Sequence, residues 1–170
     1  MSSLVFLNET TGSSVSSVNV TNVFSADYDV YMVVVHYDGS TNDLLSCKLI
    51  AADGSVIADN NYESATKFMY THTTHADSAL NNYTDAQGIF AGVGTEGGSV
   101  TYIHNPFEAT WTYMHGESMQ DAGSTTPATP HKSTAVLKQN ASMTGFQLKI
   151  DSGTIGNVTI RTYGVERWVL

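Results

Sequence analysis

Short runs of β-branched and aromatic residues, separated by turn sequences, dominate the hydrophobic pattern of the chain. The turns are Asp38-Gly39, Asp53-Gly54, Gly97-Gly98, Asn105-Pro106 and Ser152-Gly153. Between them the pattern predicts a strand within 15–24 and further strands over 28–37, 44–51, 55–58, 67–72, 89–93, 99–104, 110–115, 134–138, 144–150 and 158–163. Such spacing is typical of a sandwich or barrel, because parallel βαβ units need helical segments between strands.

Several of these runs have the period of two that a half-buried strand requires. Phe146, Leu148 and Ile150 are predicted to point inward, while Gln147 and Lys149 point outward. Residues 31–35 are instead continuously apolar, as in a strand that is buried on both faces or covered by a neighbouring subunit. Residues 75–82 could hold a helical turn, but a loop is expected there. Residues 120–131 are predicted to form a long exposed loop.

The chain has the usual size of one domain, with 170 residues of which 41% are hydrophobic. We divide it into residues 1–24, an N-terminal arm and first strand that make docking or oligomer contacts, and residues 25–170, a β-sandwich domain. Only 14% of the residues are charged, and Ser, Thr, Asn and Gly replace them. The predicted fold is an all-β, jelly-roll-like antiparallel sandwich of about eight to ten strands with little or no helix.

The net charge of −9, with seven dispersed Lys and Arg residues, argues against direct nucleic-acid binding, which needs a cationic patch. Cys47 is the single cysteine, so it forms no internal disulfide, and a buried, inert thiol is expected. The apolar run Leu4–Leu7 is too short for a signal peptide, and no later run has the length of a membrane span. We therefore expect synthesis in the cytoplasm without a standard export signal.

No motif for catalysis, metal or cofactor binding is found, and we expect a protein that is not an enzyme. The chain has no Gly-x-Ser-x-Gly elbow, no phosphate-binding glycine loop and no His-Glu-x-x-His sequence. His72, His75 and Asp77 are the nearest approach to a metal cluster, but strand positions three apart face opposite sides of a sheet. The other histidines are scattered, so surface or interface histidines are the interpretation that we favour.

Aromatic residues flank the Asn105-Pro106 turn, and two interpretations of them are open. Trp111 and Tyr113, with the carboxylate of Glu108, could stack on a sugar ring and bind its hydroxyl groups. Alternatively, these rings pack in the core or between subunits, as large aromatic side chains usually do. We favour packing, and we keep Trp111, Tyr113 and Glu108 as candidate ligand-facing residues.

A set of short segments occurs in a characteristic order along nearly the whole chain. They are Met1-Ser2-Ser3-Leu4-Val5-Phe6-Leu7, Thr11-Gly12-Ser13-Ser14, Phe24-Ser25-Ala26-Asp27-Tyr28-Asp29-Val30-Tyr31, Asn105-Pro106, Met143-Thr144-Gly145-Phe146, Asp151-Ser152-Gly153-Thr154-Ile155 and Tyr163-Gly164-Val165. This arrangement resembles a family of virion structural proteins of marine tailed bacteriophages. The resemblance implies a jelly-roll-like sandwich on the outside of the particle, assembled as a homo-oligomer, commonly a trimer.

Members of that family serve as head decoration or cement, head fibres or tail-associated proteins, and they have no catalytic motif to carry over. The resemblance therefore implies a non-enzymatic subunit on the virion surface, with its own copies, the major capsid protein or tail and fibre proteins as partners. A receptor-binding module that recognises a host surface glycan is the alternative. A cell-encoded sugar-binding or hydrolytic sandwich is a third, less favoured reading.

Two apolar segments near the ends of the chain are candidates for docking or oligomer contacts. The first is the run Leu4, Val5, Phe6 and Leu7, which could pair with a partner as an added strand. The second lies beyond the usual end of the family, where Trp168 and Leu170 either anchor a neighbouring subunit or pack on the last strand.

Overall fold

The computed structural model describes residues 3–39, 44–70, 75–91, 96–121 and 129–166, and every helix or strand assigned within them is a β-strand. The strands are β1 (Leu4–Val15), β2 (Ser17–Val20), β3 (Val30–Gly39), β4 (Leu45–Ala51), β5 (Tyr62–Phe68), β6 (Ala76–Tyr83), β7 (Ala86–Ala91), β8 (Glu96–His104), β9 (Thr112–Asp121), β10 (Thr129–Leu137), β11 (Met143–Ile150) and β12 (Ile155–Val165). Within these ranges no helix is long and apolar enough to cross a membrane.

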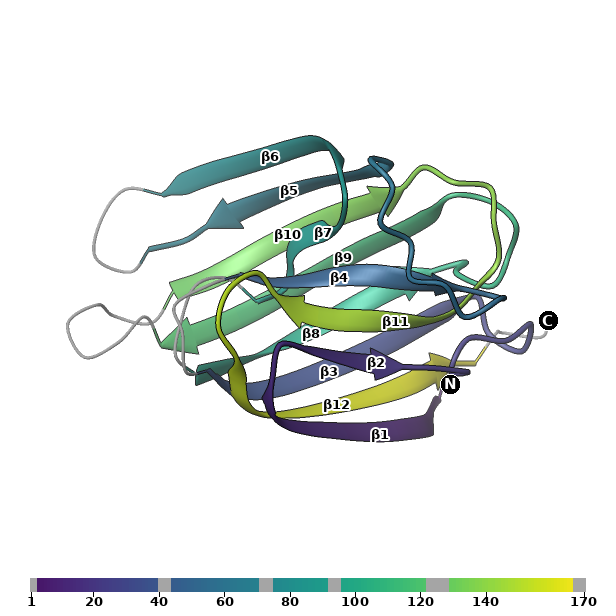
Figure 1. Ribbon diagram of the computed structural model, residues 1–170, viewed down its shortest axis with the longest axis horizontal. Helices are drawn as coiled ribbons and strands as arrows, with labels where there is room; N and C mark the ends of the chain where they lie inside the picture. Colours follow the sequence, from purple (N-terminus) through teal and green to yellow (C-terminus); the bar gives the residue numbers. More distant parts are fainter. Residues whose placement is uncertain (1–2, 40–43, 71–74, 92–95, 122–128, 167–170) are drawn as a thin grey trace.

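The strands form two antiparallel sheets of unequal size. The large sheet has the order β1-β12-β3-β8-β9-β10-β5-β6, and the small sheet has the order β2-β11-β4-β7. Figure 1 shows β2, β11 and β4 crossing the middle of the large sheet, while β5 and β6 extend beyond them. The predicted all-β antiparallel sandwich is therefore confirmed.

The chain alternates between the two sheets along most of its length. It passes from β2 in the small sheet to β3 in the large one, returns to β4, and reaches the small sheet again at β7 and β11. Several neighbouring strands consequently come from distant parts of the sequence, although β8, β9 and β10, and likewise β5 and β6, are consecutive in the chain. The first strand, β1, pairs along its length with the last, β12, from Leu4↔Val165 to Val15↔Ile155.

The core lies between the sheets and follows from the period of two. In β9 buried and exposed residues alternate without exception, and β10 follows the same pattern. Aromatic rings fill one part of the core, where Phe24 packs edge-on against Tyr31 with ring centroids 4.7 Å apart and Phe90 lies 5.5 Å from Phe146. The hydroxyl of Tyr31 donates to the carbonyl oxygen of Ser25 at 2.8 Å, so its polar end is satisfied.

Strand β7 is held against the large sheet by buried hydroxyl groups. Thr101 Oγ1 donates to the carbonyl oxygen of Ile89 at 2.9 Å, and Ser133 Oγ donates to that of Gly88 at 2.8 Å. Gly116 lies beneath the same strand, where an added Cβ would come within 2.5 Å of Thr101 Oγ1. These contacts explain why polar and small residues occupy inward positions at this end of the sandwich.

The structure corrects several predicted local elements. Residues 75–82 were expected to be a loop, but Ala76–Tyr83 is strand β6, an edge strand whose side chains are almost all exposed. The predicted strand at 67–72 is displaced, since β5 spans Tyr62–Phe68. The segment 55–58 contains one isolated bridge, Ile50↔Val56, and no strand.

The predicted exposed loop at 120–131 is wrong at both ends. Strand β9 continues to Asp121 and β10 begins at Thr129, while residues 122–128 lie outside the described part of the chain. His131, which was placed in this loop, is only 1% exposed. The continuously apolar run 31–35 divides between two faces, because Tyr31, Val33 and Val35 enter the core while Met32 and Val34 point outward.

Candidate functional site

The outward face of the large sheet carries side chains in rows that cross the strands, because paired residues on neighbouring strands point to the same face. On four strands, β1, β12, β3 and β8, a set of apolar side chains lies in these rows, next to the exposed ion pair of Arg161 with Glu9. We call this set the apolar band; it consists of Leu4, Phe6, Val30, Met32, Val34, Val100, Tyr163 and Val165. Leu4, Phe6 and Val100 are 51%, 57% and 38% exposed, so the band is open to solvent.

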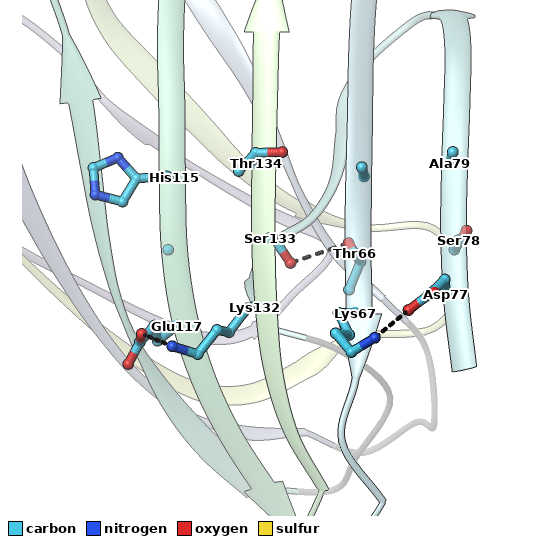
Figure 2. A pocket seen from close by; sticks show the side chains of 12 residues that line it. Thr66, Lys67, Asp77, Ser78, Ala79, His115, Glu117, Lys132, Ser133 and Thr134 are labelled. Carbon is cyan, nitrogen blue, oxygen red and sulfur yellow. Dashed lines mark hydrogen bonds and ion pairs between the residues drawn. The ribbon is translucent and has the colours of Figure 1, made fainter. Parts of the chain in front are cut away.

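The other half of the outward face, on β9, β10, β5 and β6, is hollowed by a row of small side chains. The strand register places Ala79 opposite Ala65, Ala65 opposite Thr134, and Thr134 opposite His115. We call the resulting depression the cross-strand groove. Figure 2 shows Ala79 and Thr134 along it, with longer side chains at its side.

One side of the cross-strand groove is formed by two ion pairs. Lys67 Nζ lies 3.3 Å from Asp77 Oδ1, and Lys132 Nζ lies 2.7 Å from Glu117 Oε1 (Figure 2). The hydrogen bond from Lys132 and its charge lower the pKa of the Glu117 carboxyl. All four side chains are exposed, so each retains hydrogen-bonding capacity for a ligand.

The opposite side of the groove combines an aromatic ring with polar groups. Tyr113 is 51% exposed and lies next to Val136 in the strand register. Val136 is paired in turn with Glu63, whose carboxylate accepts a hydrogen bond from Lys138 at 2.5 Å. Because the two sides lie four residues apart along each strand, their backbone positions are about 14 Å apart.

A group of three rings closes the groove at its β9 end. His115 stacks on Tyr102 with ring centroids 5.2 Å apart, and its Nδ1 lies 3.1 Å from Nε2 of His104. Partial burial lowers the pKa of His104, and the neighbouring His115 lowers it further. The end wall is thus an aromatic surface with a hydrogen-bonding edge.

The groove consists of two adjoining depressions with volumes of about 540 and 510 Å³, which share Ala65, Ala79 and Thr134. Each volume lies in the usual range for ligand sites, roughly 300–1,000 Å³. A third depression of about 380 Å³ adjoins the first at Glu117 and Lys132 and extends towards the apolar band at Val34 and Val100. The outward face therefore offers a polar-sided groove next to an apolar surface.

Of the three candidate ligand-facing residues, one lines the groove. Tyr113 forms part of its wall. Trp111 is 44% exposed and Glu108 is also exposed, but both precede β9 and neither lines the groove. Whether any of the three contacts a ligand stays a prediction.

The candidate docking residues have different positions. Leu4 and Phe6 project from β1 into the apolar band, whereas Leu7 packs partly against the core and Val5 is half-buried. Trp168 and Leu170 lie outside the described residues. The docking role of all six residues stays a prediction.

Within the described ranges, no group of three His, Cys, Asp or Glu side chains lies close enough to hold a metal ion. His72 lies outside these ranges, and Asp77 is paired with Lys67. Cys47 is fully buried, as predicted, and burial raises the pKa of its thiol, with a smaller contribution from Asp85.

The sequence pattern did not identify several residues of the cross-strand groove as candidate site residues. The row joins Ala65 and Ala79, on the consecutive strands β5 and β6, to Thr134 on β10, which is far from them in the chain. The pairing of His104 with His115 had a weak local signal, since both lie in strands that flank the Asn105-Pro106 turn. Residues on adjacent hairpin strands can be paired only after the register is known.

The chain matches no protein-family model and no curated protein. Among solved structures, it is similar to sucrose-6-phosphate hydrolase from Lactobacillus gasseri, with a TM-score of 0.35 and 12% identity over 95% of this chain and 29% of that one. It thus spans less than a third of the length of that protein.

Two viral structures are also similar at a low level. The CBM2 module of the evolved Dit of Lactobacillus casei BL23 phage J-1 has a TM-score of 0.27 and 10% identity, over 89% of this chain and 70% of the module. The infectious bursal disease virus Gx strain structure has a TM-score of 0.16 and 10% identity, over 98% of this chain and 40% of the other.

Proposed function

We propose that the protein is a non-enzymatic structural subunit of a bacteriophage particle, exposed on the virion surface and assembled as a homo-oligomer. The role is that of a capsid decoration or cement protein, or of a head or tail fibre subunit. The observation that carries this proposal is the apolar band, because a contiguous apolar surface of this kind on a soluble domain typically marks a protein interface. The ordered resemblance to phage virion proteins supplies the viral context.

The chemistry of the band suits a symmetric assembly. Its rows combine Phe6 and Tyr163, whose rings lie 5.7 Å apart, with the aliphatic residues Met32 and Val34. Aromatic and Met side chains are enriched at the cores of protein interfaces, while charged residues are depleted there. A second copy of the chain, or a capsid protein, would cover this surface in the particle.

The proposal is tested on purified particles of the phage that encodes the chain. Mass spectrometry is expected to find the protein in density-purified virions at a stoichiometry of many copies per particle. Absence of the protein from purified virions would refute the structural role. Release of the protein as an abundant free product, with virions lacking it, would point instead to a host-directed function.

The docking role of the N-terminal segment requires a substitution that leaves β1 in place, because deleting β1 would uncover β12. Replacing Leu4 and Phe6 by serine removes two exposed apolar side chains but keeps the strand. We expect this variant to be lost from particles. A Thr11→Ala variant, at an exposed position on the same strand, should be incorporated normally; equal incorporation of both variants would contradict a docking role for Leu4 and Phe6.

A further inference from the structure

The cross-strand groove has a composition that differs from that of the apolar band. Its floor consists of the small residues Ala65, Ala79 and Thr134, and its side carries two cations and two carboxylates in ion pairs. The charges at this side cancel. A ligand that lies here meets the two ammonium donors of Lys67 and Lys132 between the two carboxylate acceptors, over a floor of small side chains.

This arrangement is poorly suited to several classes of ligand. An anion would gain no net attraction from the charge-balanced side of the groove, and it would be repelled by a protein with a net charge of −9. An acyl chain or apolar peptide face would have to desolvate four charged groups, which is costly. An added peptide strand finds no free backbone groups at the floor, because β5 and β10 are paired on both sides.

A neutral polyhydroxylated ligand meets none of these obstacles. Its hydroxyl groups can donate to Asp77 or Glu117 and accept from Lys67 or Lys132, since carboxylates only accept and ammonium groups only donate. Its C–H faces can pack on the aromatic ring of Tyr113 and on the floor. We propose that the cross-strand groove binds a short neutral oligosaccharide.

Orientation of the ligand follows from the shape of the groove. The ring group of His115, Tyr102 and His104 closes one end, while β6, an edge strand, leaves the other end open. The chain of sugar units therefore runs across β6, β5 and β10, with its terminal residue against His115. This places the saccharide on the half of the outward face that the apolar band does not occupy.

Binding is measured by isothermal titration calorimetry on the full chain with maltotriose, cellotriose, mannotriose and tri-N-acetylchitotriose, and with sialyllactose and inorganic phosphate as charged probes. At least one neutral trisaccharide is expected to bind. Thr134→Leu fills the floor and should weaken that binding about tenfold or more, a change of about 1.4 kcal/mol. Tyr113→Ala should weaken it as well.

The matched control is Thr159→Leu, the same substitution on the same outward face but on β12 and away from the groove. It should leave affinity unchanged, and thermal unfolding should show that both variants fold. Failure of every neutral trisaccharide to bind, binding of the charged probes alone, or equal affinity of the Thr134→Leu variant would each overturn the proposal.

The result is independent of the structural role proposed above. A Thr134→Leu protein that loses saccharide binding but is incorporated normally into particles supports both proposals. If the wild-type protein binds no saccharide, the result of the particle experiment is unaffected. If the protein is absent from virions, the calorimetry result is unaffected.

Discussion

The imidazole of His131 lies in the interior of the sandwich, where it packs edge-on against Phe68 with ring centroids 4.5 Å apart. It is 1% exposed, and neither ring nitrogen has a hydrogen-bond partner in the described structure. Burial lowers the pKa of His131 to about 4, because the charged form loses its hydration without gaining a counter-ion.

This shift predicts an acid-sensitive fold. In the folded protein His131 resists protonation, whereas in the unfolded chain its imidazole takes up a proton near pH 6.5. The free energy of unfolding is therefore highest above that pH. It should fall by roughly 2 to 3 kcal/mol as the pH drops from about 6.5 to about 4, and change no further through this group below that. Urea unfolding monitored across this range measures the effect.

A His131→Leu variant, apolar and of similar size, should lose this component of the pH dependence. His36→Leu, at an exposed position of β3, is the matched control and should retain it. An identical slope of stability against pH in the wild type and in His131→Leu would show that His131 does not carry the acid response.

The burial of His131 was not predicted from the sequence. Its neighbours Pro127 and Pro130, with Ser, Thr and Gly, suggested a loop, so the histidine was expected at the surface. Strand β10 nevertheless begins at Thr129 and includes Pro130 at its second position. It pairs with β9 from Thr129 onward and with β5 from His131 onward. Local turn chemistry was outweighed by pairing with distant strands.

At the scale of elements, the placement of β7 depends on the absence of a side chain at Gly116. A Cβ there would lie 2.5 Å from Thr101 Oγ1 and 2.9 Å from the carbonyl oxygen of Ile89. The same hydroxyl and carbonyl form the hydrogen bond that ties β7 to β8. A substitution at Gly116 would therefore push two strands apart as well as create a clash.

We expect Gly116→Ala to destabilise the protein by about 1 to 3 kcal/mol, the usual effect of overpacking a core. The midpoint of urea unfolding gives the change. The neighbouring residue Glu117 is exposed, and Glu117→Ala should leave the midpoint of urea unfolding nearly unchanged. Similar small effects for both variants would mean that β7 can shift without cost.

The elements also show where prediction succeeded. Strands with strong alternation, such as β11 and β12, were found, because inward and outward residues differ in polarity. Strand β6 was missed, because its residues are exposed on both faces and carry no alternation. The cross-strand groove could not be predicted, since it depends on the register of β6, β5, β10 and β9.

At the scale of the whole molecule, the two halves of the outward face have different properties. The apolar band covers β1, β12, β3 and β8, and the cross-strand groove covers β9, β10, β5 and β6. A subunit built in this way can be held through one half while the other half stays accessible. The all-β sandwich was predictable from composition and turn spacing, but this division of its face was not.

Self-association through the band is expected in solution. Light scattering coupled to size-exclusion chromatography should give a mass near three times the 18.3 kDa of the chain at micromolar concentration. Replacing Val34 and Val100, which are cross-strand partners, by lysine should shift the protein to a monomer, because covering the band would then require the dehydration of two ammonium groups.

The matched control is the double variant Thr11→Lys and Thr159→Lys, which places the same charges on another cross-strand pair of the same sheet face, outside the band. This variant should keep the wild-type mass. A wild-type protein that is strictly monomeric at micromolar concentration would contradict self-association.

The pairing of β1 with β12 and of β2 with β11 has a consequence for synthesis on the ribosome. Neither of the first two strands has its neighbour until residues 143–165 have left the exit tunnel, so the sandwich must close after translation of that segment. Folds dominated by such non-local pairs form in milliseconds to seconds. Chains interrupted before β11 would leave β3 and β4 with open edges and would be targets for proteolysis.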